Sequence, residues 1–238
     1  MRSLILAIGL VAGLPCIGGP VFAQSPPPVE GVENALRARA AAAPPEGYTS
    51  IATGVFLADQ WHVLTNAHAV MACSVIKLEN SELEDVPATV IALDTRVDIA
   101  LLRSTDANSH GLGIATLDRA PGEAAKILTF DGLPGAASRG MQVPATVTAD
   151  PLSRRGLATL SVEIGSGQSG SPVIRNGDLI DGMVIGRLVR TGRGAIATGQ
   201  MISDLLEYVG LKIPSDLDAD DEFERPAEAA LVAVRCTR

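Results

Sequence analysis

The strongest constraint on the fold is a series of short apolar segments, separated by turn residues and uninterrupted by any long amphipathic helix. Segments of three to ten residues bounded by Gly, Pro, Asn and Asp are typical of strands in antiparallel sheets. The turns include Asn176-Gly177-Asp178 and Thr191-Gly192-Arg193-Gly194. The candidate strands are Tyr48–Leu57, His62–Thr65, Ser74–Leu78, Val86–Leu93, Ile99–Arg103, Lys126–Phe130, Met141–Ala149, Leu157–Glu163, Pro172–Ile174, Met183–Leu188 and Ala195–Thr198.

This series predicts an all-β fold. The number of segments favours two six-stranded antiparallel β-barrels over a single sandwich. We expect the first barrel over residues 48–133 and the second over 134–200, with the break near Leu133-Pro134-Gly135-Ala136. The first amphipathic stretch, Met201–Val209, predicts a short C-terminal helix that closes the domain.

The first 23 residues have the pattern of a secretory signal peptide. Arg2 precedes an apolar run from Leu4 to Leu14, and a small-residue cleavage site follows at Val21-Phe22-Ala23. The alternative, a transmembrane anchor, needs about 20 uninterrupted apolar residues, and this run is too short. We therefore expect an exported protein, periplasmic or extracellular, with no membrane association after cleavage.

The two ends of the mature chain differ in composition from its centre. Residues 24–47 are rich in Pro, Ala and Glu and predict a loosely packed N-terminal arm. Residues 210–238 are expected to form an acidic C-terminal tail, with six acids and no base in 216–224. Near its end, Ala230–Val234 predicts one last strand or extended segment that leads to Cys236. Asp216 begins a partial match to a calcium loop, but Asp221 stands where the turn glycine is needed. The whole chain carries a net charge of −8, which argues against a nucleic-acid partner.

Cleavage of the signal peptide leaves two cysteines, Cys73 and Cys236, in an oxidising compartment. A single disulfide is the simplest outcome, and two free buried thiols are the alternative. No His-Glu-x-x-His motif occurs, and no cysteines have zinc-ligand spacing, so we expect neither a metal nor another cofactor.

A Gly- and Ser-rich segment, residues 165–173, lies between two candidate strands and has Ser169 at its centre. A tight turn of this kind can direct backbone N–H groups at a developing negative charge, although a linker or hairpin has similar composition. A serine nucleophile also needs a base and an acid that orients the base. His68 follows the strand that ends at Thr65, and Asp98 directly precedes an apolar strand.

The order of these residues along the chain distinguishes among the serine hydrolase folds. The α/β-hydrolases place the histidine last, but no histidine follows Ser169. The subtilisin order requires an acid well before His68, and Asp59 is only nine residues away. The order His68, Asp98, Ser169 is that of the chymotrypsin type.

The sequence resembles the compact bacterial trypsin/chymotrypsin-like serine proteases over residues 48–209. Thr53-Gly54-Val55-Phe56 is similar to the strand that leads toward the family's histidine. The resemblance implies two β-barrels packed perpendicular to each other, with a His68–Asp98–Ser169 triad in the cleft between them. It also implies an oxyanion hole formed by the N–H groups of Gly167 and Ser169. The three motifs that carry it are Thr65-Asn66-Ala67-His68, Asp98-Ile99-Ala100-Leu101-Leu102 and Gly167-Gln168-Ser169-Gly170-Ser171-Pro172-Val173.

Gln168 departs from the family pattern because relatives activated by propeptide cleavage have an aspartate before the nucleophile. Gln168 cannot form an ion pair with a new N-terminus, so we expect no activation of that kind. The resemblance puts Glu163 near the base of the primary specificity pocket, with Gly186 and Arg187 on another wall. An inward Glu163 favours basic substrate side chains, while an outward one, or one paired with Arg187, does not. Arg187 could instead favour acidic substrate residues.

The sequence therefore predicts a secreted serine endopeptidase that hydrolyses protein or peptide substrates through an acyl-enzyme. An alternative is a catalytically restricted or inactive homologue that binds proteins. An esterase activity of the same triad also remains open.

Overall fold

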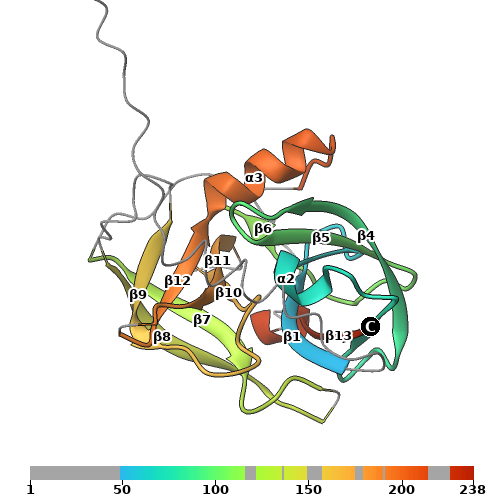
Figure 1. The fold of residues 1–238 in the computed structure, drawn as a ribbon, viewed down its shortest axis with the longest axis horizontal. Coiled ribbons are helices and arrows are strands. Elements are labelled where there is room, and N and C mark those ends of the chain that lie inside the picture. Colours follow the sequence, from blue (N-terminus) through green and yellow to red (C-terminus); the bar gives the residue numbers. More distant parts are fainter. Residues whose placement is uncertain are drawn as a thin grey trace, which may run out of the picture.

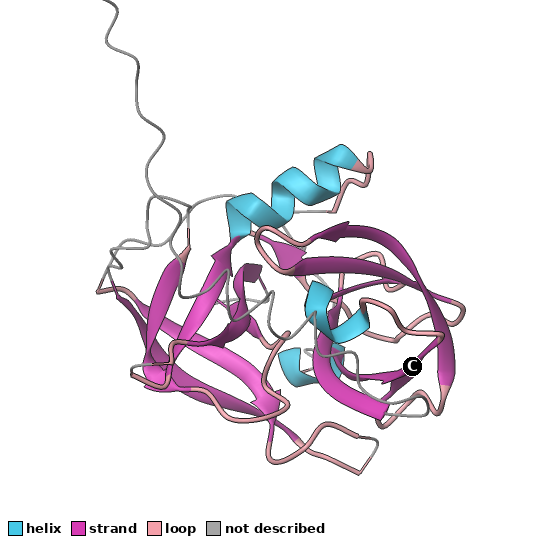
Figure 2. Cartoon of the chain, viewed as in Figure 1, coloured by secondary structure: helices cyan, strands magenta, loops and turns pink. Residues whose placement is uncertain are grey.

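The computed structural model describes residues 49–115, 122–135, 137–148, 157–174, 179–189, 191–213 and 226–238. These residues form two closed β-barrels, the first at the right and the second at the left of Figure 1. Strands dominate both barrels, and the few helices lie outside them (Figure 2). The predicted signal peptide, N-terminal arm and acidic segment 216–224 lie outside the described residues. The expected all-β architecture of two six-stranded barrels is confirmed.

The first barrel closes through strands from both ends of the described chain. Its order is β1-β13-β3-β4-β5-β2, and β1 also pairs with β2. All neighbouring strands are antiparallel. The six strands are β1 (Thr49–Phe56), β2 (His62–Thr65), β3 (Val75–Glu79), β4 (Val86–Asp94), β5 (Ile99–Ser104) and β13 (Leu231–Thr237).

The second barrel closes because β10 pairs with both β7 and β11. The order around it is β10-β7-β8-β9-β12-β11, and the two-residue strand β6 (Gly113–Ile114) adds to β11 in parallel. The six strands are β7 (Ala124–Phe130), β8 (Gly140–Thr148), β9 (Ala158–Glu163), β10 (Pro172–Ile174), β11 (Leu179–Arg187) and β12 (Arg193–Thr198).

The boundary between the barrels differs from the expected one near residue 133. Strand β7 pairs with β8 and β10, so it belongs to the second barrel and not to residues 48–133 of the first. The turn at residues 131–139 is the tip of the β7–β8 hairpin, because Asp131 and Arg139 hydrogen-bond across it. Gly and Pro mark a turn, but they do not distinguish a hairpin from a crossover between barrels.

The last strand expected at Ala230–Val234 is present as β13, but it is part of the first barrel, so the assignment of residues 210–238 to a tail is wrong for its last part. Strand β13 lies between β1 and β3, with Ala52 opposite Val234 and Ala233 opposite Glu79. Leu231 to Val234 are all buried, because the strand faces the barrel interior on one side and packed residues on the other. The short 3-10 helix η2 (Ala227–Ala230) leads into β13.

Alternating side chains divide the first barrel's apolar residues between two clusters. Val63 and Leu102 point into the barrel, whereas their neighbours Leu64 and Leu101 belong to the large cluster that also includes residues of the second barrel. This alternation is the period-two pattern of strands with both faces buried. The large cluster holds the two barrels against each other.

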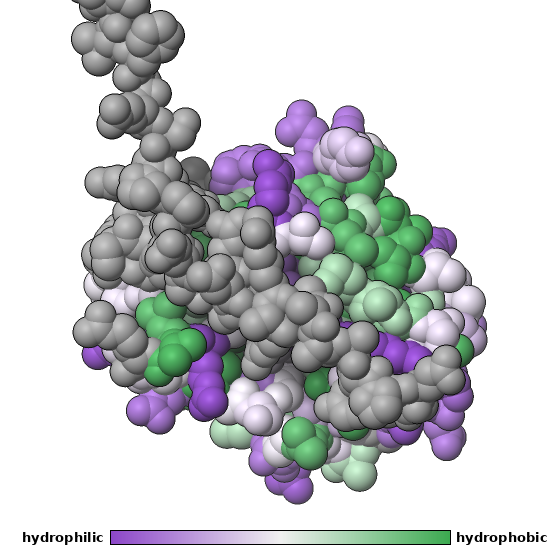
Figure 3. Space-filling model, viewed as in Figure 1, coloured by the Kyte–Doolittle hydropathy of each residue, from purple (hydrophilic) through white to green (hydrophobic). Residues whose placement is uncertain are grey.

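Helix α3 (Gly199–Tyr208) follows β12 and lies over the large cluster. Its residues Ile202, Leu205 and Leu206 are buried, while Tyr208 is exposed. On the face shown in Figure 3, apolar residues gather between α3 and strands β4 and β5. The helix was expected at residues 201–209, so its presence and place are confirmed with a start two residues earlier. None of the helices in the described ranges has the length and hydropathy required to cross a membrane.

Candidate active site

His68 and Asp98 meet at one end of the first barrel. His68 lies in the short helix α2 (Ala67–Val70), which follows β2, and Asp98 directly precedes β5, the strand paired with β2. The imidazole Nδ1 of His68 lies 2.6 Å from Asp98 Oδ2. The backbone N–H of His68 donates to the other carboxylate oxygen at 2.8 Å. Asp98 thus holds both the ring and the backbone of His68.

The Asp98 backbone adopts an unusual conformation that neighbouring groups stabilise. Its φ of +60° lies in the left-handed region, where non-glycine residues other than Asn and Asp are uncommon. Its carbonyl accepts hydrogen bonds from the Asn66 side-chain amide at 3.0 Å and the Ala67 N–H at 3.3 Å. The Asp98 side chain is 3% exposed and that of His68 is 21% exposed. The carboxylate is therefore shielded from water while part of the imidazole remains accessible.

The loop that carries Ser169 is held by its own backbone and by Gln168. The Gln168 side chain accepts a hydrogen bond from the N–H of Gly165 at 2.7 Å, and the Gln168 carbonyl accepts one from Ser171 at 3.1 Å. The N–H of Gly170 donates to the carbonyl of Val184 on β11 at 2.8 Å. Gln168 therefore stabilises the turn through hydrogen bonds within the loop. Its side chain takes this role at the position where family members activated by cleavage have an aspartate.

Four consecutive N–H groups of this loop, those of residues 166–169, have no acceptor in the described part of the chain. They include the N–H groups of Gly167 and Ser169, the two residues predicted to form an oxyanion hole. Gly167 has a φ of +83°. Because a buried N–H normally finds a partner, unpaired N–H groups beside a half-buried serine are suited to bind an anionic oxygen.

Thr53 on β1 connects the serine loop to the first barrel. Its N–H donates to the Ser169 carbonyl at 2.9 Å, and its Oγ1 donates to the Gly167 carbonyl at 2.8 Å. The Thr53 carbonyl in turn accepts a hydrogen bond from Thr65 Oγ1 at 2.8 Å. Thr65 stands three residues before His68, so these contacts bring the serine loop close to the histidine. No hydrogen bond joins His68 Nε2 to Ser169 Oγ among the described residues, and such bonds often tighten only when substrate binds.

The comparisons with known proteins agree with this geometry. Residues 52–186, more than half of the chain, match the family described as the trypsin-like peptidase domain. The chain belongs to the trypsin-like peptidase family. A curated relative, the uncharacterized protein y4bJ of Sinorhizobium fredii, is 29% identical over 216 residues and covers 82% of this chain. The match spans about a third of that relative's length (34%), and its name gives no activity.

Solved structures share the fold of this trypsin-like peptidase. The active form of the Rv3671c protease from M. tuberculosis has a TM-score of 0.57 at 22% identity, covering 86% of this chain and 96% of that chain. The serine endoprotease from Yersinia pestis has a TM-score of 0.56 at 18% identity, covering 67% of this chain and 57% of that chain. At such low identity, these likenesses show the fold alone.

The peptidase's predicted specificity residues lie on two elements beside the serine loop. Glu163, at the end of β9, is exposed, with its carboxyl group next to the Gly192 turn and no ion pair to Arg187 in the described ranges. Of the alternatives considered from the sequence, the pairing of Glu163 with Arg187 is therefore not found among the described residues. Gly186 lies at an irregularity of β11, has a φ of +152° and has no atom within 4 Å of an added Cβ. Arg187, the last residue of β11, is exposed.

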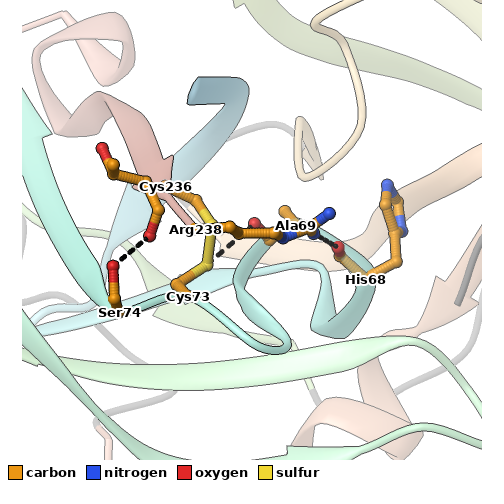
Figure 4. The surroundings of a disulfide bond; sticks show 7 residues. His68, Ala69, Cys73, Ser74, Cys236 and Arg238 are labelled. Atoms are coloured by element: carbon orange, nitrogen blue, oxygen red, sulfur yellow. Dashed lines mark hydrogen bonds between the residues drawn. A yellow bond between two sulfur atoms is a disulfide. The ribbon is translucent and has the colours of Figure 1, made fainter. Parts of the chain in front are cut away.

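The predicted Cys73–Cys236 disulfide is confirmed, with its two Cα atoms 5.5 Å apart. Figure 4 shows that it joins the end of β13 to the chain just after α2. Arg238, two residues beyond Cys236, donates from its guanidinium to the His68 carbonyl at 3.2 Å. The Ser74 N–H donates to the Thr237 carbonyl at 2.8 Å. The C-terminal strand is thus fastened directly to the helix that carries the candidate catalytic histidine.

Sequence reasoning named His68, Asp98 and Ser169 but missed the residues that hold them in place. Thr53 and Asn66 lay within the quoted motifs without an assigned role, and Arg238 had no motif at all. The polar type of Thr53 within the otherwise apolar run Ile51–Leu57 was the one available signal. Among the described residues no cluster of His, Cys, Asp and Glu has the arrangement of a metal site.

Proposed function

We propose that this trypsin-like peptidase is an exported serine endopeptidase that uses His68, Asp98 and Ser169 as its catalytic triad. The observation that carries the proposal is the two-point contact of Asp98 with His68. The neighbouring serine loop supports it, because its N–H groups, including those of Gly167 and Ser169, have no acceptor among the described residues. An inactive binding homologue would have no need of a buried carboxylate directed at an accessible imidazole. The disulfide supports export, because disulfides persist in oxidising compartments.

The proposed reaction divides peptide hydrolysis into two steps. Ser169 Oγ attacks the scissile carbonyl carbon while His68 Nε2 takes the hydroxyl proton. The C–N bond then breaks, and the His68 proton passes to the leaving amine, which gives an acyl-enzyme. Water attacks the acyl-enzyme with His68 again accepting a proton, and Ser169 is released with its hydroxyl restored. Asp98 holds the imidazole tautomer and stabilises its charged form.

The negative charge that develops on the substrate oxygen is stabilised by the N–H groups of Gly167 and Ser169. Removal of one such donor typically slows an enzyme by about 10²–10³-fold. Because Gly167 and Ser169 use backbone groups, the site does not depend on a side-chain donor that could rotate away.

An extended substrate can be accommodated along β11. Val184 is hydrogen-bonded to Gly170 and Ser171 of the serine loop, and β11 continues beyond it through Gly186 to Arg187. That continuation pairs with β12 on one side and has no strand partner on the other among the described residues. A peptide can add to such a strand edge through main-chain hydrogen bonds, which suits an endopeptidase.

The test is covalent labelling by a fluorophosphonate, followed by digestion of a peptide library. The wild type should be labelled and should cleave internal bonds, whereas Ser169→Ala should do neither. Ser166→Ala, which changes a serine of the same loop, is the matched control and should retain both activities. Labelling of Ser169→Ala, or an unlabelled but folded wild type, would falsify the proposal and favour a binding homologue. Hydrolysis of esters without peptides would indicate an esterase.

The proposed export has its own test, expression of the full-length chain with its first 23 residues in a bacterial host. Periplasmic or secreted protein with an N-terminus at Gln24 is expected, while uncleaved protein in the cytoplasm would contradict export.

A further inference from the structure

We infer that Thr53 is the positioning residue of the oxyanion hole, which rests on the proposed function. It lies on β1 in the first barrel, whereas the N–H groups that it would position belong to the serine loop of the second barrel. Thr53 is fully buried, so it acts through the loop and does not touch a substrate.

The contacts of Thr53 fix two of the loop's peptide groups. Its Oγ1 holds the carbonyl of Gly167, and its N–H holds the carbonyl of Ser169. The peptide between Gln168 and Ser169 lies between these two fixed groups, and its own carbonyl accepts from Ser171. C=O and N–H point in opposite directions across a trans peptide. The fixed Gln168 carbonyl therefore also fixes the direction of the Ser169 N–H in the same peptide.

The side-chain contact matters because Gly167 lacks a side chain and its backbone is conformationally permissive. A glycine with a φ of +83° has many alternative conformations, and the Thr53 hydroxyl is the hydrogen-bond partner of its carbonyl. Without this bond, the peptide after Gly167 can rotate, and rotation would alter the directions of the neighbouring N–H groups. Preorganised donors stabilise a transition state more effectively than donors that must first reorient.

A second layer of contacts holds Thr53 in turn. Thr65 Oγ1 donates to its carbonyl, and Gly170 packs so closely that an added Cβ would lie 1.8 Å from the Thr53 carbonyl oxygen. Thr65 ends β2, and Asn66 and Ala67 then lead to His68. The oxyanion loop and the histidine therefore share one buried support, which keeps their relative position constant.

The test compares Thr53→Val, which keeps the shape and removes the hydroxyl, with Thr53→Ser, which retains it. We expect Thr53→Val to lower kcat by about tenfold or more with little change in KM, because transition-state binding alone is weakened. Its affinity for a peptide aldehyde, which forms a tetrahedral adduct with the serine, should fall by a similar factor. Thr53→Ser should restore both values to near those of the wild type.

Thr148→Val is the matched control, because it removes a threonine hydroxyl hydrogen bond within the second barrel, between β8 and β9. It should change unfolding stability without changing kcat or aldehyde affinity. Should the valine variant not fold, Thr53→Cys keeps the size with a weaker donor, and its kcat must then lie below that of Thr53→Ser.

Wild-type kcat and aldehyde affinity in folded Thr53→Val, or equal values for Thr53→Cys and Thr53→Ser, would overturn the inference. Both outcomes leave the proposed protease function intact, because the wild type would still be labelled and active. Absence of labelling in the wild type would instead refute the proposed function itself.

Discussion

The guanidinium of Arg238 donates a hydrogen bond of 3.2 Å to the backbone carbonyl of His68, 170 residues earlier in the chain. Together with the disulfide two residues before it, this contact attaches strand β13 to helix α2. The strand that completes the first barrel is therefore also part of the support of the candidate catalytic histidine.

Arg238→Met should weaken the hold on His68 while keeping most of the side-chain volume. The hydrogen bond is partly exposed, so we expect a loss of unfolding free energy of about 1 kcal/mol and a fewfold lower kcat. Arg238→Lys retains a charged donor, so its unfolding free energy and kcat should lie between those of the wild type and Arg238→Met. Urea unfolding and steady-state kinetics measure these effects, and a kcat for Arg238→Met equal to that of the wild type would disprove a role in positioning.

Removal of the disulfide in a Cys73→Ser, Cys236→Ser double variant should destabilise the protein strongly. The bridge closes a loop with a sequence separation of 163 residues, and loss of a native disulfide typically costs about 2–5 kcal/mol. Urea unfolding of both proteins, with and without reductant, measures the difference. Reductant should lower the stability of the wild type and leave the double variant unchanged. Equal stability of the two oxidised proteins would contradict this prediction.

Asn66→Leu should impair catalysis more than stability. The change removes the hydrogen bond to the Asp98 carbonyl, and it also removes Asn66 Oδ1, a buried oxygen with no hydrogen-bond partner among the described residues. We expect kcat to fall by about tenfold, because small misplacements of catalytic groups are costly. Asn108→Leu is the control. It removes the hydrogen bonds that the buried Asn108 side-chain amide donates to the carbonyls of His110 and Ala229, away from the site. Asn108→Leu should lose stability but keep kcat. If Asn66→Leu instead lost stability and kept the kcat of the wild type, a positioning role for Asn66 would be excluded.

The local chemistry of the site could be predicted from the sequence because its motifs are short and ordered. The residues around His68, Asp98 and Ser169 each adjoin an apolar strand, and their order selects one fold. The same local reasoning located the strands and α3, since turn residues and periodicity act over a few positions. The cysteine pair was predictable because cleavage of the proposed signal peptide would leave only Cys73 and Cys236.

The supporting contacts could not be predicted because they depend on pairing between distant segments. Nothing local indicates that β13 inserts between β1 and β3, or that Thr53 reaches the carbonyl of Gly167. Strand β7 was assigned to the wrong barrel for the same reason, because the sequence of an apolar strand does not identify the strand with which it pairs. The direction of Glu163 likewise depended on the Gly192 turn, whose geometry is set by pairing of β9 with β12.

Gly170→Ala should abolish labelling by the fluorophosphonate. The φ of Gly170 is +89°, and an added Cβ would lie 1.8 Å from the Thr53 carbonyl oxygen, so the loop would have to move. We expect a loss of about 3 kcal/mol or more in unfolding free energy. Gly132→Ala is the matched control, because nothing lies within 4 Å of its added Cβ. It should be labelled like the wild type, and normal labelling of Gly170→Ala would show that the loop does not require this close approach.

Asp59→Asn should reduce stability in a pH-dependent way. Partial burial would raise the pKa of Asp59, but hydrogen bonds from the His62 side chain and from the N–H groups of His62 and Trp61 outweigh it and lower the pKa. A lowered folded-state pKa means that the carboxylate stabilises the fold above its unfolded pKa of about 3.9. This contribution is lost as the pH falls through the folded value.

The variant should therefore be less stable than the wild type at pH 7, by about 1 kcal/mol, and the difference should shrink below pH 4. Urea unfolding at several pH values measures it, followed by the fluorescence of Trp61, the one tryptophan of the chain. Asp106→Asn, which changes an exposed carboxylate with no side-chain bond among those described, should keep the wild-type pH dependence. A stability difference for Asp59→Asn that stays constant from pH 7 to pH 3 would show that the hydrogen bonds to Asp59 do not favour its charged form.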